Sequence, residues 1–159
     1  RRMMCLTGGL NGVPSLTNSS FYKELALFIF QNFRNAKKII ELGVGFSPQT
    51  AIKLRQLLPR IEIIVVDKNP EALKGLDSYG LKAVQDDLFN PKLEIYRSTD
   101  LLYSIHPPLE LIEPMKNLAE RVKALLLIKP LSEDAYFYGF YKWKQVKLSP
   151  CTLYLWRNE

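Results

Sequence analysis

Five short, largely apolar runs recur along this 159-residue chain and constrain its fold more than any other feature. They occupy residues 39–42, 61–66, 81–84, 101–105 and 124–128. Runs of this length without regular polar alternation are typical of strands buried on both faces, as in a parallel sheet covered by helices. The sequence therefore predicts an α/β protein, a Rossmann-like three-layer sandwich whose sheet is mainly parallel.

Helical and turn segments separate these runs. Apolar residues at helical spacing behind N-cap candidates Asn18, Ser19 and Ser20 predict a helix that ends near Phe33. Further helices, several opened by a proline as the first turn allows, are expected at 48–58, 70–76, 91–96 and 114–123. Residues 141–148 and 152–156, separated by Ser149-Pro150, predict a C-terminal antiparallel hairpin.

The length and the 47% apolar content are those of one domain, expected over residues 15–159 behind an N-terminal arm of residues 1–14. Cys5 and Cys151 form no CxxC or Cys/His cluster, so neither a disulfide framework nor a metal site is expected. No apolar run approaches the roughly 20 residues needed to span a bilayer. We therefore expect a cytoplasmic protein without membrane association.

The net charge of +6, from 22 Lys and Arg against 16 Asp and Glu, favours anionic partners. RNA is one such partner, although many basic proteins bind no nucleic acid. The charge alone therefore leaves the partner open, and the oligomeric state is equally unassigned.

The stretch from Ile39 to Pro48 reads as a strand, a glycine turn and the start of a helix. Because Gly43 and Gly45 lack side chains, a ligand can approach the main chain closely at this turn, while Ser47 can cap the helix that follows. In an open α/β sheet such a turn lies at the carboxyl ends of the strands, where ligands bind.

Carboxylates follow the predicted strands. Glu41 lies near the end of the first strand, where its charge suits a cationic ligand group. Asp67 ends the second strand, 24 residues after Gly43, which is the separation expected of a carboxylate that binds ribose hydroxyls. Asp86 and Asp87 follow the third strand, and either could bind an adenine amino group; Asp87 is the preferred residue.

These residues resemble the class I S-adenosylmethionine (AdoMet)-dependent methyltransferases over roughly residues 37–131. Residues 41–45, ELGVG, look like their first motif, 66–67 like their second and 85–88 like their third. The resemblance implies that Glu41, Gly43 and Gly45 border the methionine part, Asp67 the ribose and Asp87 the adenine. The chain is also similar in length and layout to a group of small archaeal proteins of this type.

The glycine turn leaves a second cofactor to consider, and one departure from the methyltransferase motif favours a module that binds without catalysis. Ser47 stands where the methyltransferase motif has its third glycine. The NAD fingerprint, in turn, needs Gly or Ala at position 48, where this chain has Pro48. An NAD-linked oxidoreductase is therefore the weaker alternative.

The loop after the fourth run, Ser104 to Pro108, partly resembles the N-P-P-Y loop of amine methyltransferases, with His106 in place of Asn. His106 is the only histidine, and it could act as a general base, donate a hydrogen bond to a substrate, or simply satisfy a local carbonyl group.

Aromatic and basic residues crowd together just before the predicted hairpin. The aromatic ones are Tyr136, Phe137, Tyr138, Phe140, Tyr141 and Trp143, beside Lys142, Lys144 and Lys147. Such residues can grip single-stranded RNA by stacking, or they can pack as hairpin core. The sequence thus favours an AdoMet-dependent methyltransferase of unassigned acceptor; the alternative is a non-catalytic RNA-binding module on the same fold.

Overall fold

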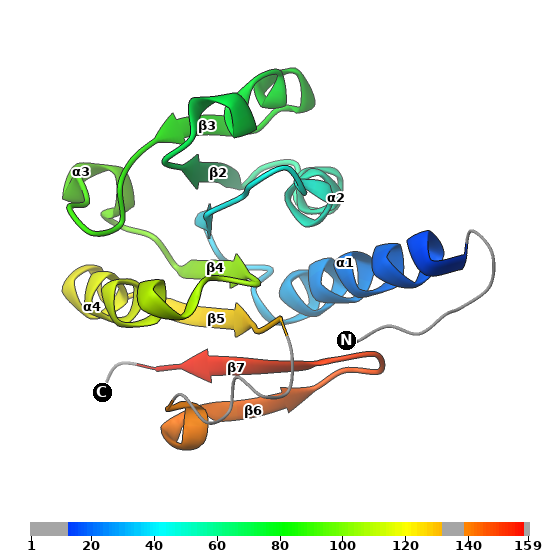
Figure 1. The fold of residues 1–159 in the computed structure, drawn as a ribbon. Coiled ribbons are helices and arrows are strands. Elements are labelled where there is room, and N and C mark those ends of the chain that lie inside the picture. The colour runs from blue at the N-terminus through cyan, green and yellow to red at the C-terminus, as the bar shows by residue number, and fades with distance from the viewer. Residues whose placement is uncertain (1–12, 132–138, 158–159) are drawn as a thin grey trace.

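A seven-stranded mixed sheet forms the centre of the protein (Figure 1). The computed structural model describes residues 13–131 and 139–157. In sheet order the strands are β3 (Lys82–Gln85), β2 (Glu62–Asp67), β1 (Lys38–Leu42), β4 (Leu101–Ile105), β5 (Leu125–Lys129), β7 (Thr152–Trp156) and β6 (Lys144–Lys147). The first five are parallel, and β7 runs antiparallel to both of its neighbours. The mainly parallel sheet and the C-terminal antiparallel hairpin predicted from the sequence are both confirmed.

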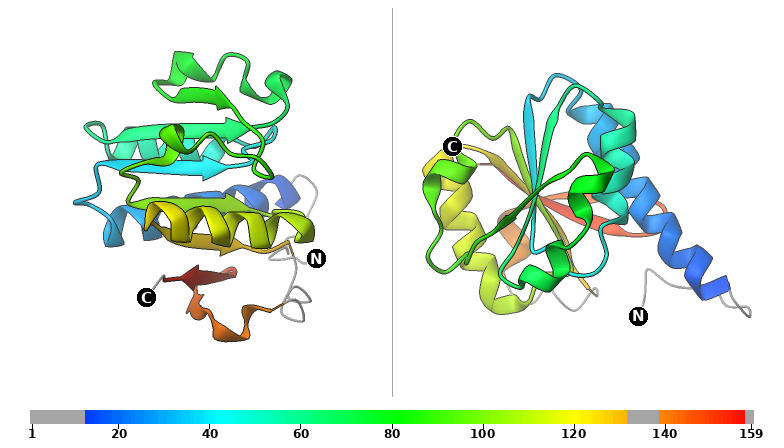
Figure 2. Two further views of the ribbon diagram at one scale, coloured as in Figure 1. Left: turned by 90° about the vertical axis from the view of Figure 1, so that its left-hand side faces the viewer. Right: turned by 90° about the horizontal axis from the view of Figure 1, so that it is seen from above.

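Helices cover both faces of the sheet, which makes three layers (Figure 2). The helix α1 (Val13–Asn32) packs beside α2 (Gln49–Leu57) on one face. The other face carries α3 (Leu93–Tyr96) and α4 (Ile112–Val122). Short 3-10 turns complete the connections: η1 (Pro70–Leu73), η2 (Leu76–Tyr79), η3 (Leu109–Leu111) and η5 (Phe140–Lys142). None of the described helices is long and apolar enough to cross a membrane.

Two apolar cores, one on each face, explain why the central strands are largely apolar. In β1, Ile39 packs into the core formed with Leu25 and Ile29 of α1, whereas Ile40 packs into the core formed with Met115 of α4. Successive side chains of a strand point to opposite faces, so a strand between two helical layers buries both sets. The outer strand β3 differs from the prediction, because its residues are only partly buried or exposed.

The connection between β2 and β3 contains no α-helix, contrary to the helix predicted at 70–76. Gly75 adopts φ of 77°, and it separates the two 3-10 turns η1 and η2. A left-handed residue ends a helix, so the sequence Pro70 to Tyr79 forms two short turns instead of one longer helix.

Two other helices begin earlier than the sequence suggested. The helix α1 begins at Val13, so Pro14 lies in its first turn and not in the proposed arm. The helix α4 begins at Ile112, which places Pro114 in its first turn, where proline removes no intrahelical hydrogen bond. Residues 1–12 of the proposed arm lie outside the described residues.

The chain order reverses at the centre of the sheet. From β1 the chain proceeds outward to β2 and β3, and then returns to place β4 on the other side of β1. At such a reversal the connections leave the carboxyl ends of β1 and β4 in opposite directions, which opens a crevice between them. The name carboxyl edge is used below for this crevice together with the carboxyl ends of the five parallel strands, β1 to β5.

Candidate functional site

The turn after β1 exposes main chain at the carboxyl edge. Its first two N–H groups, those of Gly43 and Val44, donate to the carbonyl oxygen of Val66 at 2.8 and 3.0 Å. Gly43 and Gly45 have φ of 69° and 58°, a conformation that disfavours residues with side chains. A β-carbon added to either glycine would meet no heavy atom within 4 Å, so both face open space. A ligand group can therefore lie directly against this turn.

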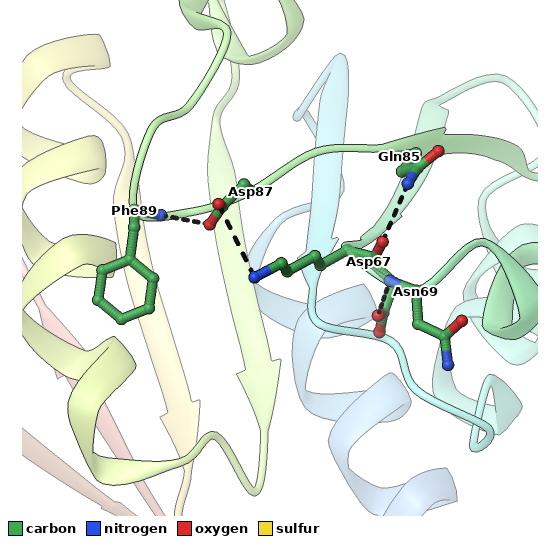
Figure 3. Close-up of polar contacts among 6 residues, drawn as sticks. Asp67, Asn69, Gln85, Asp87 and Phe89 are labelled. Carbon is green, nitrogen blue, oxygen red and sulfur yellow. Dashed lines mark hydrogen bonds and ion pairs between the residues drawn. The ribbon is translucent and has the colours of Figure 1, made fainter.

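Asp67 ties that turn to the end of β2. Its Oδ2 accepts the Gly45 N–H at 2.7 Å, and its Oδ1 accepts the Asn69 N–H at 2.9 Å. Figure 3 shows the second of these bonds. Each carboxylate oxygen has a further lone pair, so Asp67 can hold the turn and still accept hydrogen bonds from ligand hydroxyls.

The neighbouring carboxylates of Asp86 and Asp87 have different environments. Asp86 is 6% exposed, and its Oδ2 accepts the Tyr96 O–H at 2.6 Å and the Lys92 N–H at 3.1 Å. Burial, together with Asp86, raises the pKa of Tyr96, so this phenol remains a donor. Asp86 is therefore engaged in fixing α3, and a ligand would have to displace these bonds.

Asp87, in contrast, is accessible. Its side chain is 42% exposed; Oδ1 accepts the Phe89 N–H at 3.0 Å, and Oδ2 lies 4.0 Å from Lys68 Nζ (Figure 3). The rings of Phe89 and Phe46, on the loops after β3 and β1, are 61% and 73% exposed. Exposed aromatic rings on two loops of this edge, together with an accessible carboxylate, suit a flat, hydrogen-bonding ring.

Glu41 is buried within β1, beneath the turn. It is 1% exposed, and its Oε1 accepts the O–H of Tyr103, its register partner on β4, at 2.7 Å. Burial raises the pKa of Glu41 to about 8; the Tyr103 hydrogen bond lowers it, and the Asp67 charge raises it further. At neutral pH Glu41 is mostly protonated, so the charge that the sequence argument gave it is suppressed.

Ser104 connects the two strands that flank the crevice. Its buried hydroxyl, near the end of β4, donates to the Leu42 carbonyl oxygen at the end of β1, at 2.8 Å. Ser47 does not cap α2 as expected: Pro48 occupies the N-cap position, and no side chain caps this helix. The helix end is thus not closed by a hydroxyl.

His106 lies at the end of β4 and contacts a residue that the sequence analysis missed. Its Nε2 is 2.9 Å from Nζ of Lys129, the last residue of β5, and its backbone N–H donates to the Lys129 carbonyl oxygen at 2.7 Å. Burial, and then the Lys129 charge, lower the pKa of His106 to about 4. A neutral imidazole therefore lies at the end of β4, between Lys129 and the Phe21 ring. A lysine that ends a buried apolar strand was the signal available in the sequence.

The aromatic stretch contributes more to the core than to a surface. Phe140 and Trp143 are 4% and 7% exposed, and their rings pack edge to face with centroids 4.9 Å apart. Tyr136, Phe137 and Tyr138 lie outside the described residues. A cleft on the hairpin is nevertheless lined by basic and apolar side chains, those of Lys142, Lys144, Leu155, Trp156 and Arg157.

The described ranges, 13–131 and 139–157, contain no cluster of side chains that could bind a metal ion. No group of three or more His, Cys, Asp or Glu side chains is arranged there to hold an ion.

Comparison with known sequences gives one family. Residues 23–154 match the uncharacterised protein family UPF0146. A UPF0146 protein of Pyrococcus horikoshii is 41% identical over 111 residues, which cover 70% of this chain and 82% of that protein. A UPF0146 protein of Methanocaldococcus jannaschii is 40% identical over 105 residues, covering 66% and 74%.

Solved structures of similar fold are more distant in sequence. The AdoMet-dependent methyltransferase SibL in its apo form has a TM-score of 0.63 at 14% identity, covering 94% of this chain and 60% of that one. The N-terminal domain of EvdMO1, solved with S-adenosylhomocysteine (AdoHcy) and D-fucose, has a TM-score of 0.64 at 14% sequence identity. The match covers 87% of this chain and 83% of that one. A chain of the fibrillarin/Nop5p complex has a TM-score of 0.60 at 18% sequence identity, and the match covers 86% of this chain and 80% of that one. At these identities the likeness establishes the methyltransferase-like α/β fold.

Proposed function

This chain belongs to the UPF0146 family of small archaeal proteins, and from that premise we propose that it binds AdoMet at its carboxyl edge and transfers the methyl group to an acceptor. The observation that carries the proposal is the arrangement around the glycine turn. Open main chain at Gly43 and Gly45 lies beside Asp67, whose carboxylate is hydrogen-bonded to that turn. The neighbours SibL and EvdMO1 support it, since SibL is an AdoMet-dependent methyltransferase and the EvdMO1 domain was solved with AdoHcy.

The residues present fit the parts of AdoMet. The glycine turn leaves space for the methionine chain, and Asp67 has lone pairs left for both ribose hydroxyls. Asp87 would accept the adenine amino group, with the exposed ring of Phe89 beside it. Glu41 would support the turn from below as a neutral acid, and Asp86 would hold the loop through Tyr96.

When bound, AdoMet supplies a methyl group on a sulfonium, and transfer leaves AdoHcy. The transfer would be an in-line displacement at the methyl carbon. Such a displacement depends chiefly on alignment. The Ser104 hydrogen bond to Leu42 contributes to that alignment, because it fixes the ends of β1 and β4 on the two sides of the crevice.

Titration calorimetry with AdoMet, AdoHcy and NAD tests this proposal. We expect AdoMet and AdoHcy to bind and NAD to give no heat of binding, because Pro48 stands where a pyrophosphate-binding turn needs a small residue. Binding of NAD alone would support the oxidoreductase alternative and overturn the proposal. If AdoMet binds, methyl transfer from labelled AdoMet is measured with archaeal extracts that contain small molecules, RNA or protein as acceptors.

One observation favours RNA binding without catalysis as a second candidate. The cleft on the hairpin combines Lys142, Lys144 and Arg157 with the half-buried ring of Trp156. Lys116 Nζ of α4 lies 4.3 Å from the centre of that ring and 3.6 Å from Glu113 Oε2, so its charge is partly compensated. Cations beside an aromatic face suit the phosphates and bases of single-stranded RNA. The fibrillarin chain in the comparison was solved with Nop5p, so a chain of this fold can also work in an assembly.

RNA binding through this cleft would depend strongly on salt. The double variant Lys144→Gln, Arg157→Gln should weaken binding of a single-stranded RNA and reduce its salt dependence. The matched control is Lys74→Gln with Lys53→Gln, which removes two charges elsewhere. Equal losses in both pairs would indicate unspecific attraction to the net charge and would reject the cleft as the site.

A further inference from the structure

The ammonium of Lys129 is buried among neutral groups. Lys129 is 3% exposed. Its Nζ donates to the Pro130 carbonyl oxygen at 3.0 Å, lies 2.9 Å from His106 Nε2, and lies 4.6 Å from the centre of the Phe21 ring. Within residues 13–131 and 139–157, Lys129 forms no ion pair with a carboxylate. A buried positive charge is costly unless an anion compensates it, so this arrangement favours an anion close by.

The contact with Lys129 fixes which ring nitrogen of His106 carries the proton. An ammonium has donors only, so Nε2 must accept and the neutral ring must carry its proton on Nδ1. The lowered pKa of His106, about 4, agrees with a neutral ring at physiological pH. His106 Nε2 is thereby unavailable as a proton acceptor for a substrate, which removes the general-base role that the sequence left open.

The backbone of His106 adopts a conformation that costs conformational free energy. His106 has φ of 55°, a left-handed conformation that is uncommon for residues other than glycine, although asparagine, aspartate and histidine adopt it more often than the rest. Its backbone N–H bond to the Lys129 carbonyl and the ring contact with Phe21, at 5.2 Å between centroids, secure it from two sides. His106 is partly exposed, whereas Lys129 and Phe21 are buried. The imidazole is thus the part of the cluster that solvent reaches.

We propose that His106, through its Nδ1–H, binds an anionic oxygen of the methyl acceptor, a carboxylate or a phosphate. Lys129 acts as a positioning residue: its charge polarises the ring through Nε2 and strengthens the opposite N–H as a donor. In the part of the chain that the structure describes, this N–H has no hydrogen-bond acceptor. The cluster lies at the ends of β4 and β5, beside the crevice, so the inference rests on the proposed function and names the acceptor class for that site.

Nitrogen NMR of the imidazole tests this directly, because His106 is the only histidine in the chain. In the wild-type protein we expect the Nδ1–H tautomer, and inorganic phosphate or acetate should shift its Nδ1 resonance until it saturates. A stronger response to phosphate would indicate a phosphorylated acceptor, and a stronger response to acetate a carboxylic acid. An Nε2–H tautomer, or no saturable shift with either anion, would overturn the proposal.

A variant pair separates this role from a structural one. Lys129→Met keeps a side chain of similar length and removes the charge; it should weaken anion binding by about tenfold, because the imidazole loses the charge that polarises it. The same change at exposed Lys147 should leave the response intact. Equal affinities in Lys129→Met and wild type would reject the role of Lys129, and the wild-type measurements still decide the case if Lys129→Met fails to fold. The anions are added without AdoMet, so failure here is distinguishable from failure of AdoMet binding.

Discussion

Over β1 to β3 the carboxyl edge presents the carboxylates of Asp67 and Asp87, whereas over β4 and β5 it presents the imidazole of His106 backed by the ammonium of Lys129. The crevice at the chain reversal separates these two halves. The backbone at the ends of the parallel strands is similar in both halves. The difference therefore comes from the side chains at and just after each strand end, and not from the fold. The acidic half suits the hydroxyls and amines of an adenosyl group, and the basic half suits an anion.

The largest expected effect comes from filling the glycine turn of the acidic half. In Gly45→Val the side chain would occupy the open space above the turn, and AdoMet affinity should fall more than about a hundredfold, or roughly 3 kcal/mol. Calorimetry measures this loss. Gly75→Val is the matched control, because Gly75 also has positive φ and open space around it. Both variants should lose about 1 to 2 kcal/mol of unfolding free energy from backbone strain, but only the first should lose AdoMet. Retained binding in Gly45→Val would remove the turn from the site.

The next effect concerns the carboxylate beside that turn. Asp67→Ala should weaken AdoMet by about 1.5 to 3 kcal/mol, roughly 10- to 150-fold, because the ribose hydroxyls lose a charged acceptor. The exposed Asp77, in η2, provides the control: Asp77→Ala should bind AdoMet like the wild type. If both variants bind equally well, the acidic half does not hold the ribose.

The two halves should also respond to pH in opposite directions. The pKa of Glu41 rises from 4.5 to about 8 on folding, so the folded state loses stability as the pH rises through that interval. The pKa of His106 falls from 6.5 to about 4 on folding, so the folded state loses stability as the pH falls through that range. Between pH 6.5 and 8 the Glu41 contribution dominates, because the His106 contribution changes there by only about 0.4 kcal/mol, and the unfolding free energy should decline by roughly 1 to 2 kcal/mol.

Glu41→Gln should abolish this decline, because glutamine does not titrate. Urea unfolding at a series of pH values measures it. His106→Gln, which leaves Glu41 in place, should retain the decline above pH 6.5 and lose mainly the change below it. A wild-type stability that stays level between pH 6.5 and 8 would contradict the buried, protonated Glu41.

The smallest effect sharpens a contrast in backbone. The acidic half uses glycine where φ is positive, whereas the basic half uses His106 at φ of 55°. His106→Gly should therefore be more stable than His106→Ala by about 1 kcal/mol, since only glycine adopts this conformation without strain. Lys123, at φ of 62°, should show the same order. An alanine variant at position 106 as stable as the glycine variant would show that no strain is held there.

Much of the fold was predictable because the signals are local. Largely apolar runs located the five parallel strands to within one residue at each end, since burial on both faces of every one but the outer strand β3 leaves no regular polar alternation. The helix predicted over 70–76 was wrong for a local reason too: the left-handed Gly75 outweighed the apolar spacing. The residues at the strand ends were likewise readable, because carboxylates after successive strands are visible in the sequence.

Contacts between strands could not be read in this way. Glu41 and Tyr103 are 62 residues apart in the chain and meet only because β1 and β4 pair in one particular register. The same holds for His106 and Lys129 across β4 and β5. Register depends on how the layers pack as a whole, so the sequence indicated which side chains reach the edge but not which neighbours neutralise, polarise or bury them.

The position of β7 has a consequence for how the protein is made. β6 pairs within the sheet only with β7, and β7 in turn pairs with β5. During synthesis β6 leaves the ribosome first, before β7, the only strand with which it pairs in the finished sheet. The parallel strands can assemble on the nascent chain as they appear, whereas the last two must arrive as a pair. Completion of the sheet is therefore a late and concerted event that awaits Trp156.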